Sequence, residues 1–166
     1  RHLLGNTRAR VSSNGLTLEE LEAPAIAAGS LRGRNVLILG GGRTGQATAV
    51  FAAAAGANVT VHDTDSIDRV VGAAEAFSGS AIRTSFGDAE NLAPLLAAAD
   101  LVVHSPAVTL GFPTVRPAIE RGLRAFAAQA IPLAGERATR GPVLISEPEW
   151  ALRLLGSRWR VGVTGT

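Results

Sequence analysis

The sequence V-L-I-L-G-G-G-R-T-G-Q-A, residues 36–47, decides how the rest of the chain is interpreted. Four apolar residues run directly into a glycine-rich turn, and an alanine-rich segment of helical character follows. Gly40, Gly42 and Gly45 fit the pattern G-x-G-x-x-G, whose glycines allow a tight strand-to-helix turn, close approach of a phosphate, and close packing of helix on strand. The exposed N–H groups of this turn, with the positive end of a helix dipole behind them, predict a diphosphate site. Arg43 is placed to neutralise a phosphate there, although a solvated arginine is equally compatible.

Short apolar runs and helical segments alternate along the rest of the chain. Strands that are separated by helices favour parallel pairing, so the sequence predicts an α/β fold. We expect it to be Rossmann-like, with a mostly parallel, doubly wound sheet and helices on both faces. The predicted strands are Val36–Leu39, Asn58–His62, Ala81–Ser85, Leu101–His104, Val143–Ile145 and Val161–Val163, and the predicted helices are Thr44–Ala55, Asp68–Phe77, Leu92–Ala98, Thr114–Ala130 and Glu149–Leu155.

Three segments are expected along the chain. Residues 1–30 begin polar and irregular and are expected to form a loosely attached leader, in which Thr17 and Glu20 give a capping-box pattern that opens a short helix. Residues 31–158 are expected to form the Rossmann-like domain. Residues 159–166 are expected to form the first strand of a second domain and the start of its phosphate loop. Both ends are therefore expected to be cut from a longer protein.

The composition argues against several classes of function. The chain has 166 residues, a net charge of +2 and no cysteine, which leaves no disulfide and no thiolate metal site. Lysine is absent, so the sequence pI of about 10.8 reflects missing titratable groups rather than a dense basic surface. With 4% aromatic residues and no basic cluster, we expect no nucleic-acid partner. No apolar run approaches the roughly 18 residues of a membrane span, and we expect a cytoplasmic monomer.

Further candidate residues follow the other strands. Asp63 ends the second predicted strand, where an acidic residue can accept hydrogen bonds from ribose hydroxyls. The alternative is that Asp63 caps the turn that begins at Thr64. Ser105 and Pro106 follow the fourth strand, and ligands of open α/β sheets lie across the carboxyl ends of the strands. His104 has no visible acidic partner, which favours a structural role.

The last part of the chain holds two more motifs. In E-P-E, residues 147–149, the carboxylates have no fixed common target, so one of them is expected to cap the following helix. V-G-V-T-G-T at 161–166 is typical of a strand that opens a phosphate loop of the form G-x-x-x-x-G-K-[ST]. The sequence shows no nucleophilic triad and no spacing that indicates a metal site built by this chain alone.

Three motifs in one order resemble those of the Mur ligases. They are L-G-G-G-R-T-G at 39–45, S-P at 105–106, and E-P-E-W followed by V-G-V-T-G-T between 147 and 166. The resemblance covers about residues 31–166, apart from the stretch around 124–141. Within the family, the motifs are most similar to those of the ligases that add D-glutamate to UDP-N-acetylmuramoyl-L-alanine.

The resemblance implies a first domain that binds the UDP part of a cell-wall precursor, and a central domain that uses ATP and magnesium to form an acyl phosphate, which the amino acid attacks. This chain alone is then expected to be inactive, with no catalytic residue of its own. By position, the resemblance assigns the diphosphate to Gly42, Arg43, Thr44 and Gly45, the uridine to Asp63 and Thr64, the wall of the same pocket to Ser105 and Pro106, and the start of the ATP loop to Thr164, Gly165 and Thr166.

Two other functions remain open from the residues. The glycine pattern with Asp63 is equally typical of an NAD-binding module of a dehydrogenase. A non-catalytic module that binds a nucleotide or a partner protein is the other alternative.

Overall fold

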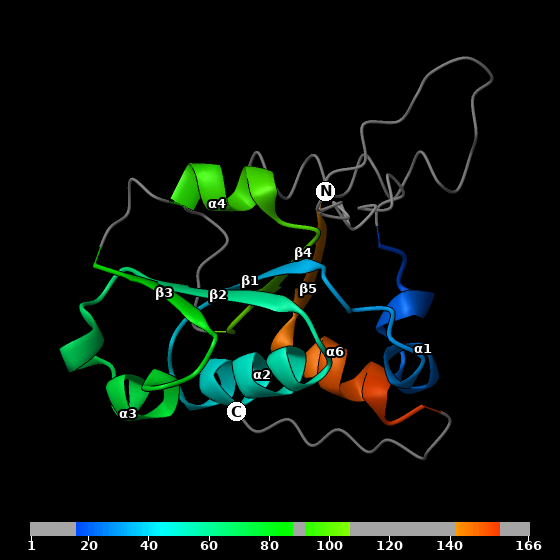
Figure 1. Ribbon diagram of the computed structural model, residues 1–166, viewed down its shortest axis with the longest axis horizontal. Helices are drawn as coiled ribbons and strands as arrows, with labels where there is room; N and C mark the ends of the chain where they lie inside the picture. Colours follow the sequence, from blue (N-terminus) through cyan, green and yellow to red (C-terminus); the bar gives the residue numbers. More distant parts are fainter. Residues whose placement is uncertain (1–15, 88–91, 107–141, 157–166) are drawn as a thin grey trace, which may run out of the picture.

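The computed structural model describes residues 16–87, 92–106 and 142–156, which form a five-stranded sheet between two layers of helices (Figure 1). All neighbouring strands pair in parallel, in the order β3-β2-β1-β4-β5. This arrangement confirms the predicted α/β, Rossmann-like fold. The strands are β1 Asn35–Leu39, β2 Asn58–Asp63, β3 Arg83–Phe86, β4 Leu101–His104 and β5 Val143–Ser146.

The helices cover both faces of the sheet. In Figure 1, α2, α3 and α6 lie below the sheet and α4 lies above it. Each crossover returns the chain to a parallel strand, which is the doubly wound arrangement. The helices are α1 Ala23–Ala27, α2 Arg43–Ala54, α3 Ala73–Phe77, α4 Leu92–Ala98 and α6 Glu147–Leu154, and the short 3-10 helices are η1 Glu19–Leu21 and η2 Ile67–Arg69.

The central strand β1 is buried on both faces because its side chains alternate between two apolar clusters. Val36 and Ile38 belong to the larger cluster on the side of α2. Leu37 and Leu39 belong to the smaller cluster, which contains the buried leucines of α4. A continuous apolar run of this kind is what a parallel strand covered on both faces requires.

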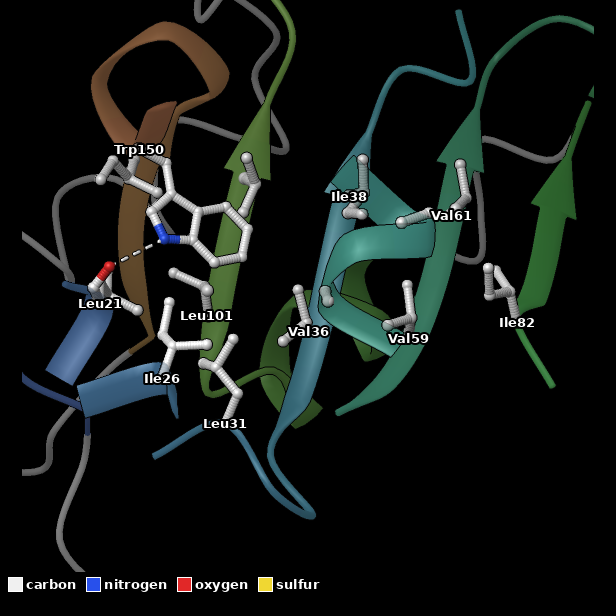
Figure 2. Packing of buried hydrophobic residues seen from close by; sticks show 14 of the residues in the cluster. Leu21, Ile26, Leu31, Val36, Ile38, Val59, Val61, Ile82, Leu101 and Trp150 are labelled. Carbon is white, nitrogen blue, oxygen red and sulfur yellow. Dashed lines mark hydrogen bonds between the residues drawn. The ribbon is translucent and has the colours of Figure 1, made fainter. Parts of the chain in front are cut away.

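The expectation of a loosely attached leader is wrong for residues 16–30. Leu21 and Leu31 are fully buried in the larger cluster, and Ile26 lies between them in sequence and is also buried. The indole N–H of Trp150 in α6 donates a hydrogen bond of 3.2 Å to the carbonyl oxygen of Leu21 (Figure 2). The apolar side chains of this segment therefore complete the core instead of covering a finished domain. Residues 1–15 lie outside the described part of the chain.

The predicted capping box is present, and the helical segment that follows it is divided into η1 and α1. Thr17 N–H donates to Glu20 Oε2 at 2.7 Å, and Glu20 N–H donates to Thr17 Oγ1 at 3.3 Å. Hydrogen bonds from the backbone N–H of Glu19 and from the hydroxyl of Thr17 lower the pKa of the Glu19 carboxyl. The turn ends at Glu22, which is extended, and α1 begins anew with Pro24 in its first turn. Proline is favoured in the first turn of a helix, where its missing N–H would have no partner, so Pro24 suits the start of a new helix.

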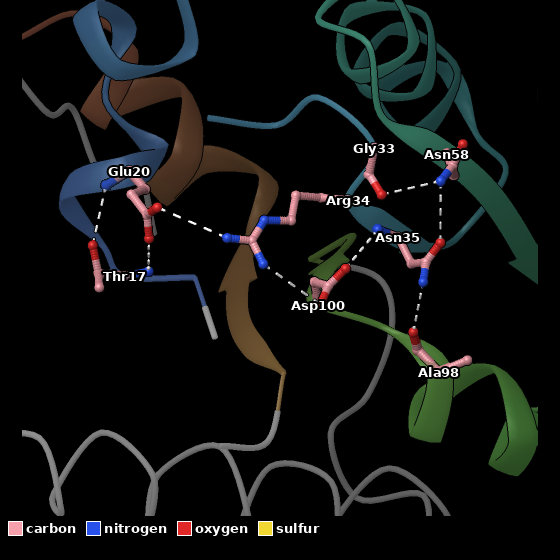
Figure 3. A network of polar contacts seen from close by, with 8 residues as sticks. All are labelled: Thr17, Glu20, Gly33, Arg34, Asn35, Asn58, Ala98 and Asp100. Atoms are coloured by element: carbon pink, nitrogen blue, oxygen red, sulfur yellow. Dashed lines mark hydrogen bonds and ion pairs between the residues drawn. The ribbon is translucent and has the colours of Figure 1, made fainter. Parts of the chain in front are cut away.

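Polar contacts fasten the same segment to the amino ends of the strands (Figure 3). The Arg34 guanidinium lies 3.9 Å from Glu20 Oε1 and 4.0 Å from Asp100 Oδ1. Asp100 also accepts the Asn35 N–H at 2.8 Å, which joins the start of β1 to the turn before β4. These contacts lie at the end of the sheet opposite to the glycine turn.

Two predicted helices have different limits in the structure. The helix expected over Asp68–Phe77 is divided into η2 and α3, because Gly72 adopts a left-handed φ of 77° immediately before α3. Helix α6 begins at Glu147, two residues earlier than predicted, because Ser146 supplies its N-cap. The predicted helix at 114–130 and strand at 161–163 lie outside the described residues, as does the predicted boundary between domains at 159.

Candidate functional site

The candidate site lies where β1, β2 and β4 end. The register pairs Leu39 of β1 with His62 of β2 on one side and with His104 of β4 on the other. Backbone hydrogen bonds continue this register by one residue, from Gly40 N–H to His62 O and from Ser105 N–H to Leu39 O, both at 2.9 Å. The glycine turn and the loops after β2 and β4 therefore meet at one edge. Because the strand order reverses direction between β1 and β4, this edge is the switch point at which α/β sheets bind ligands.

The glycine turn presents an open helix N-terminus. Gly42 is the N-cap of the twelve-residue helix α2 and offers no side chain to the N–H groups of the first turn. A Cβ at Gly42 would meet no atom within 4 Å, and the side chains of Arg43 and Thr44 are exposed. Gly45 is buried, and a Cβ there would overlap the carbonyl oxygen of Gly40. The turn thus leaves room on its outer side for an anion and none on its inner side.

Asp63 holds the glycine turn in place. Its Oδ2 accepts the Gly41 N–H at 2.7 Å and its Oδ1 accepts the Asp65 N–H at 3.0 Å. The second bond is the turn-capping role that was the alternative interpretation of this residue. The first bond spans 22 residues of sequence and was not predicted. Each carboxylate oxygen retains a second lone pair, so contacts from Asp63 to a ligand remain possible.

Two further residues complete a clamp around Gly41. Gln46 Nε2 donates to the Gly41 carbonyl at 2.8 Å and to the Val71 carbonyl at 2.9 Å. The ring of Phe86 lies so close that a Cβ on Gly41 would stand 2.5 Å from its Cζ atom. Neither residue was predicted to belong to the site, and the contact with Phe86 at the end of β3 depends on how the fold brings β3 to the glycine turn.

The remaining predicted residues of the described chain lie at the same edge. Thr64 and Pro106 are exposed, and Ser105 is half-buried. His104 Nδ1 lies 3.1 Å from the Ser105 carbonyl, which fits the structural role expected for this histidine. The ligand contacts assigned to these residues stay predictions. Thr164, Gly165 and Thr166 lie outside the described residues.

Glu147 is a residue of the site that the sequence analysis considered only as a possible helix cap. Its side chain is 7% exposed, and neither carboxylate oxygen has a hydrogen-bond partner within the described chain. Its Oε1 lies 3.5 Å from the position of a Cβ on Gly45. The expectation that a glutamate caps α6 is wrong, since the Ser146 hydroxyl accepts the Glu149 N–H at 3.3 Å and Glu149 itself pairs with Arg153.

The packing of α6 beside α2 brings Glu147 to this position. The rings of Phe51 in α2 and Trp150 in α6 meet edge-on, with centroids 5.5 Å apart. Because Glu147 is the first residue of α6, it lies level with the first turn of α2. The N-termini of both helices therefore open toward the same edge of the sheet.

Other features of the described residues are weaker candidates for a ligand site than this edge of the sheet. A cavity of about 220 Å³ lies under α4, lined among others by Asn35, Leu37 and Arg83 toward the amino ends of the strands. Its polar side chains already bond within the protein, since Arg83 Nε donates to Thr60 Oγ1 and Asn35 Nδ2 donates to the Ala98 carbonyl, both at 3.2 Å. The described residues hold no group of three or more potential metal ligands. None of their helices is long and apolar enough to cross a bilayer.

Comparison with known proteins agrees with this geometry. The family model for the N-terminal domain of MurD-like Mur ligases matches residues 34–127. A curated relative, UDP-N-acetylmuramoylalanine–D-glutamate ligase of Anaeromyxobacter dehalogenans (strain 2CP-C), is 35% identical over 142 residues. That alignment covers 85% of this chain and 26% of the relative, so the chain spans about a quarter of the relative's length. The chain belongs to the Mur ligase family, as a MurD-like N-terminal domain.

Proposed function

We propose that this chain binds the UDP part of a cell-wall precursor for a ligase that adds D-glutamate to UDP-N-acetylmuramoyl-L-alanine. The observation that carries the proposal is the open N-terminus of α2 at the β1–β4 switch point, in a chain of the MurD-like family. Backbone N–H groups and a helix dipole suit a diphosphate without requiring a lysine. The substrate and the amino acid of the proposal are those for which the relative from Anaeromyxobacter dehalogenans is named.

Each predicted residue has a role in this proposal. The N–H groups of residues 42–45 receive the diphosphate, with Arg43 reaching its outer oxygens. Asp63 and Thr64, at the end of β2, contact the uridine, while Asp63 also fixes the turn through Gly41. Ser105 and Pro106, which follow β4, form the opposite wall. Thr164, Gly165 and Thr166 begin the ATP loop.

The chemical step belongs to the whole ligase. Bound ATP and magnesium would activate the carboxyl group of the precursor by forming an acyl phosphate. This chain contains no lysine to hold the β- and γ-phosphates of ATP. Its own residues bind and orient the nucleotide end of the substrate, so we expect no ligase turnover by this chain alone. We also propose a role in peptidoglycan synthesis, in the cytoplasm, for the intact ligase.

An NAD-binding module is the second candidate, because Asp63 ends β2 as the acid of a dinucleotide site does. Asp63 does not separate the two candidates, because each of its carboxylate oxygens retains a lone pair for a ribose hydroxyl of either ligand. Family membership favours the UDP-linked ligand.

Calorimetric titration of the chain separates the two candidates. UDP, UDP-N-acetylmuramoyl-L-alanine and NADH are compared, with UMP as the control that lacks the second phosphate. We expect both UDP compounds to bind at least about tenfold more tightly than UMP and NADH, a difference of about 1.4 kcal/mol. Tighter binding of NADH would reverse the assignment, and equal binding of UDP and UMP would remove the diphosphate from the site.

A further inference from the structure

The proposed function does not explain why the buried carboxylate of Glu147 has no hydrogen-bond partner among the described residues. A buried charge without a partner is costly, and native proteins keep such groups where a ligand, ion or water completes them. Glu147 is 7% exposed and has no hydrogen-bond partner for either oxygen within the described chain. It lies against Gly45, in the first turn of the helix whose N-terminus is open.

A carboxylate at this place opposes the binding of a bare diphosphate. The α2 N-terminus contributes about half a positive charge, and Arg43 is exposed, where solvent screens it. Each phosphate of a UDP-linked precursor carries one negative charge, and Glu147 adds a further one. The excess of negative charge implies that a cation accompanies the ligand.

We propose that the glycine turn binds the diphosphate together with a divalent metal ion, and that Glu147 is the protein ligand of this ion, directly or through one of its waters. The inference rests on the proposed function, whose ligand supplies the phosphate oxygens. Magnesium suits the arrangement, because it keeps several waters and is commonly held by one or two carboxylates with substrate phosphates. This explains why a metal site can exist although the described residues offer no cluster of three ligands.

The neighbouring acid of the same helix provides a matched control. Glu149 lies two residues away, has an exposed side chain, and pairs with Arg153 at 3.2 Å. Glu147→Gln and Glu149→Gln remove the same charge from the same turn of α6. Only the first removes it from beside the glycine turn.

Calorimetric titration with UDP, in millimolar magnesium or in EDTA, measures the gain from the metal. For the wild-type chain and Glu149→Gln, we expect magnesium to tighten UDP binding at least about tenfold. For Glu147→Gln, we expect tighter binding in EDTA than wild type, because the repulsion is gone, and a gain from magnesium below about twofold. A gain below about twofold in the wild-type chain, or the full gain in Glu147→Gln, would overturn the proposal.

Manganese broadening of amide signals in the wild-type chain gives a second measurement that does not depend on a folded variant. With UDP present, substoichiometric Mn²⁺ should broaden the signals of residues 40–45 and 147 before others. Broadening centred elsewhere would overturn the metal site while leaving the UDP site intact. Failure of UDP to bind in either buffer would overturn the proposed function, and this inference with it.

Discussion

Substitution by alanine should have different consequences at two glycines of the turn, Gly42 and Gly45. Gly42 has a φ of −64° and a ψ of −176°, which any residue adopts, and a Cβ there meets open space. Gly45 lies in the first turn of α2, where a Cβ would overlap the carbonyl oxygen of Gly40. Alanine at 42 should therefore impair binding, and alanine at 45 should impair folding.

The expected magnitudes follow from these surroundings. At Gly42, alanine loses up to about 1 kcal/mol as an N-cap residue and regains about 0.4–1 kcal/mol by restricting the unfolded chain. The free energy of unfolding should change little. The added methyl group occupies the space that a phosphate needs, so UDP binding should weaken at least about tenfold. At Gly45, overpacking costs about 1–3 kcal/mol or more, and the obstacle is backbone that cannot rotate away.

Urea denaturation followed by circular dichroism measures the free energy of unfolding, and calorimetric titration with UDP measures the affinity for the ligand. Gly42→Ala should keep the wild-type midpoint and lose affinity. Gly45→Ala should shift the midpoint to lower urea. The reasoning is refuted if Gly45→Ala is as stable as wild type, or if Gly42→Ala binds UDP with unchanged affinity.

Three other predictions follow from the clamp, the core and the charge of the ligand. Asp63→Ala leaves the N–H of Gly41 without its acceptor. It should therefore cost about 1–3 kcal/mol of unfolding free energy and shift the amide NMR signal of Gly41. The control Thr64→Ala should do neither. Trp150→Phe leaves a buried carbonyl unpaired and should cost about 1–3 kcal/mol in urea titration, with the more exposed Leu152→Ala as a control expected to cost less. UDP affinity should fall as sodium chloride rises, because salt screens the diphosphate from Arg43; an affinity independent of salt would contradict an anion-driven site.

The strand, turn and helix over residues 36–54 could be predicted from the sequence because their signals are local. Four apolar residues, spaced glycines and an alanine-rich segment specify β1 and α2 within a few residues of where they form. The parallel pairing of the strands followed from the alternation of strands and helices along the chain, whereas their order was not predicted. The parts of the site that lie on these elements were therefore found.

The contacts that fix the site could not be predicted, because each joins residues that only the fold brings together. Asp63 was expected at the end of β2, but its bond to Gly41 depends on the register between β1 and β2. Glu147 was interpreted from its neighbours in sequence as a cap. Its proximity to Gly45 depends instead on how α6 packs against α2.

The burial of the apolar residues in the amino-terminal segment could not be predicted from the sequence either. Leu16, Leu21, Ile26 and Leu31 recur every fifth residue, a spacing typical of neither a helix nor a strand. The structure buries all four, because two short helical turns separated by the extended Glu22 carry them onto the edge of the sheet.

The clamp around Gly41 bears on how the site distinguishes ligands. Its N–H is held by Asp63, its carbonyl by Gln46, and its Cα by the ring of Phe86, so the turn is fixed before a ligand arrives. A fixed turn loses little entropy on binding, and the affinity that results applies to any diphosphate. Discrimination between a UDP-linked precursor and a dinucleotide must then come from groups outside the turn, at the ends of β2 and β4. The buried carboxylate of Glu147 adds a second criterion, because it disfavours an anion that arrives without a metal ion.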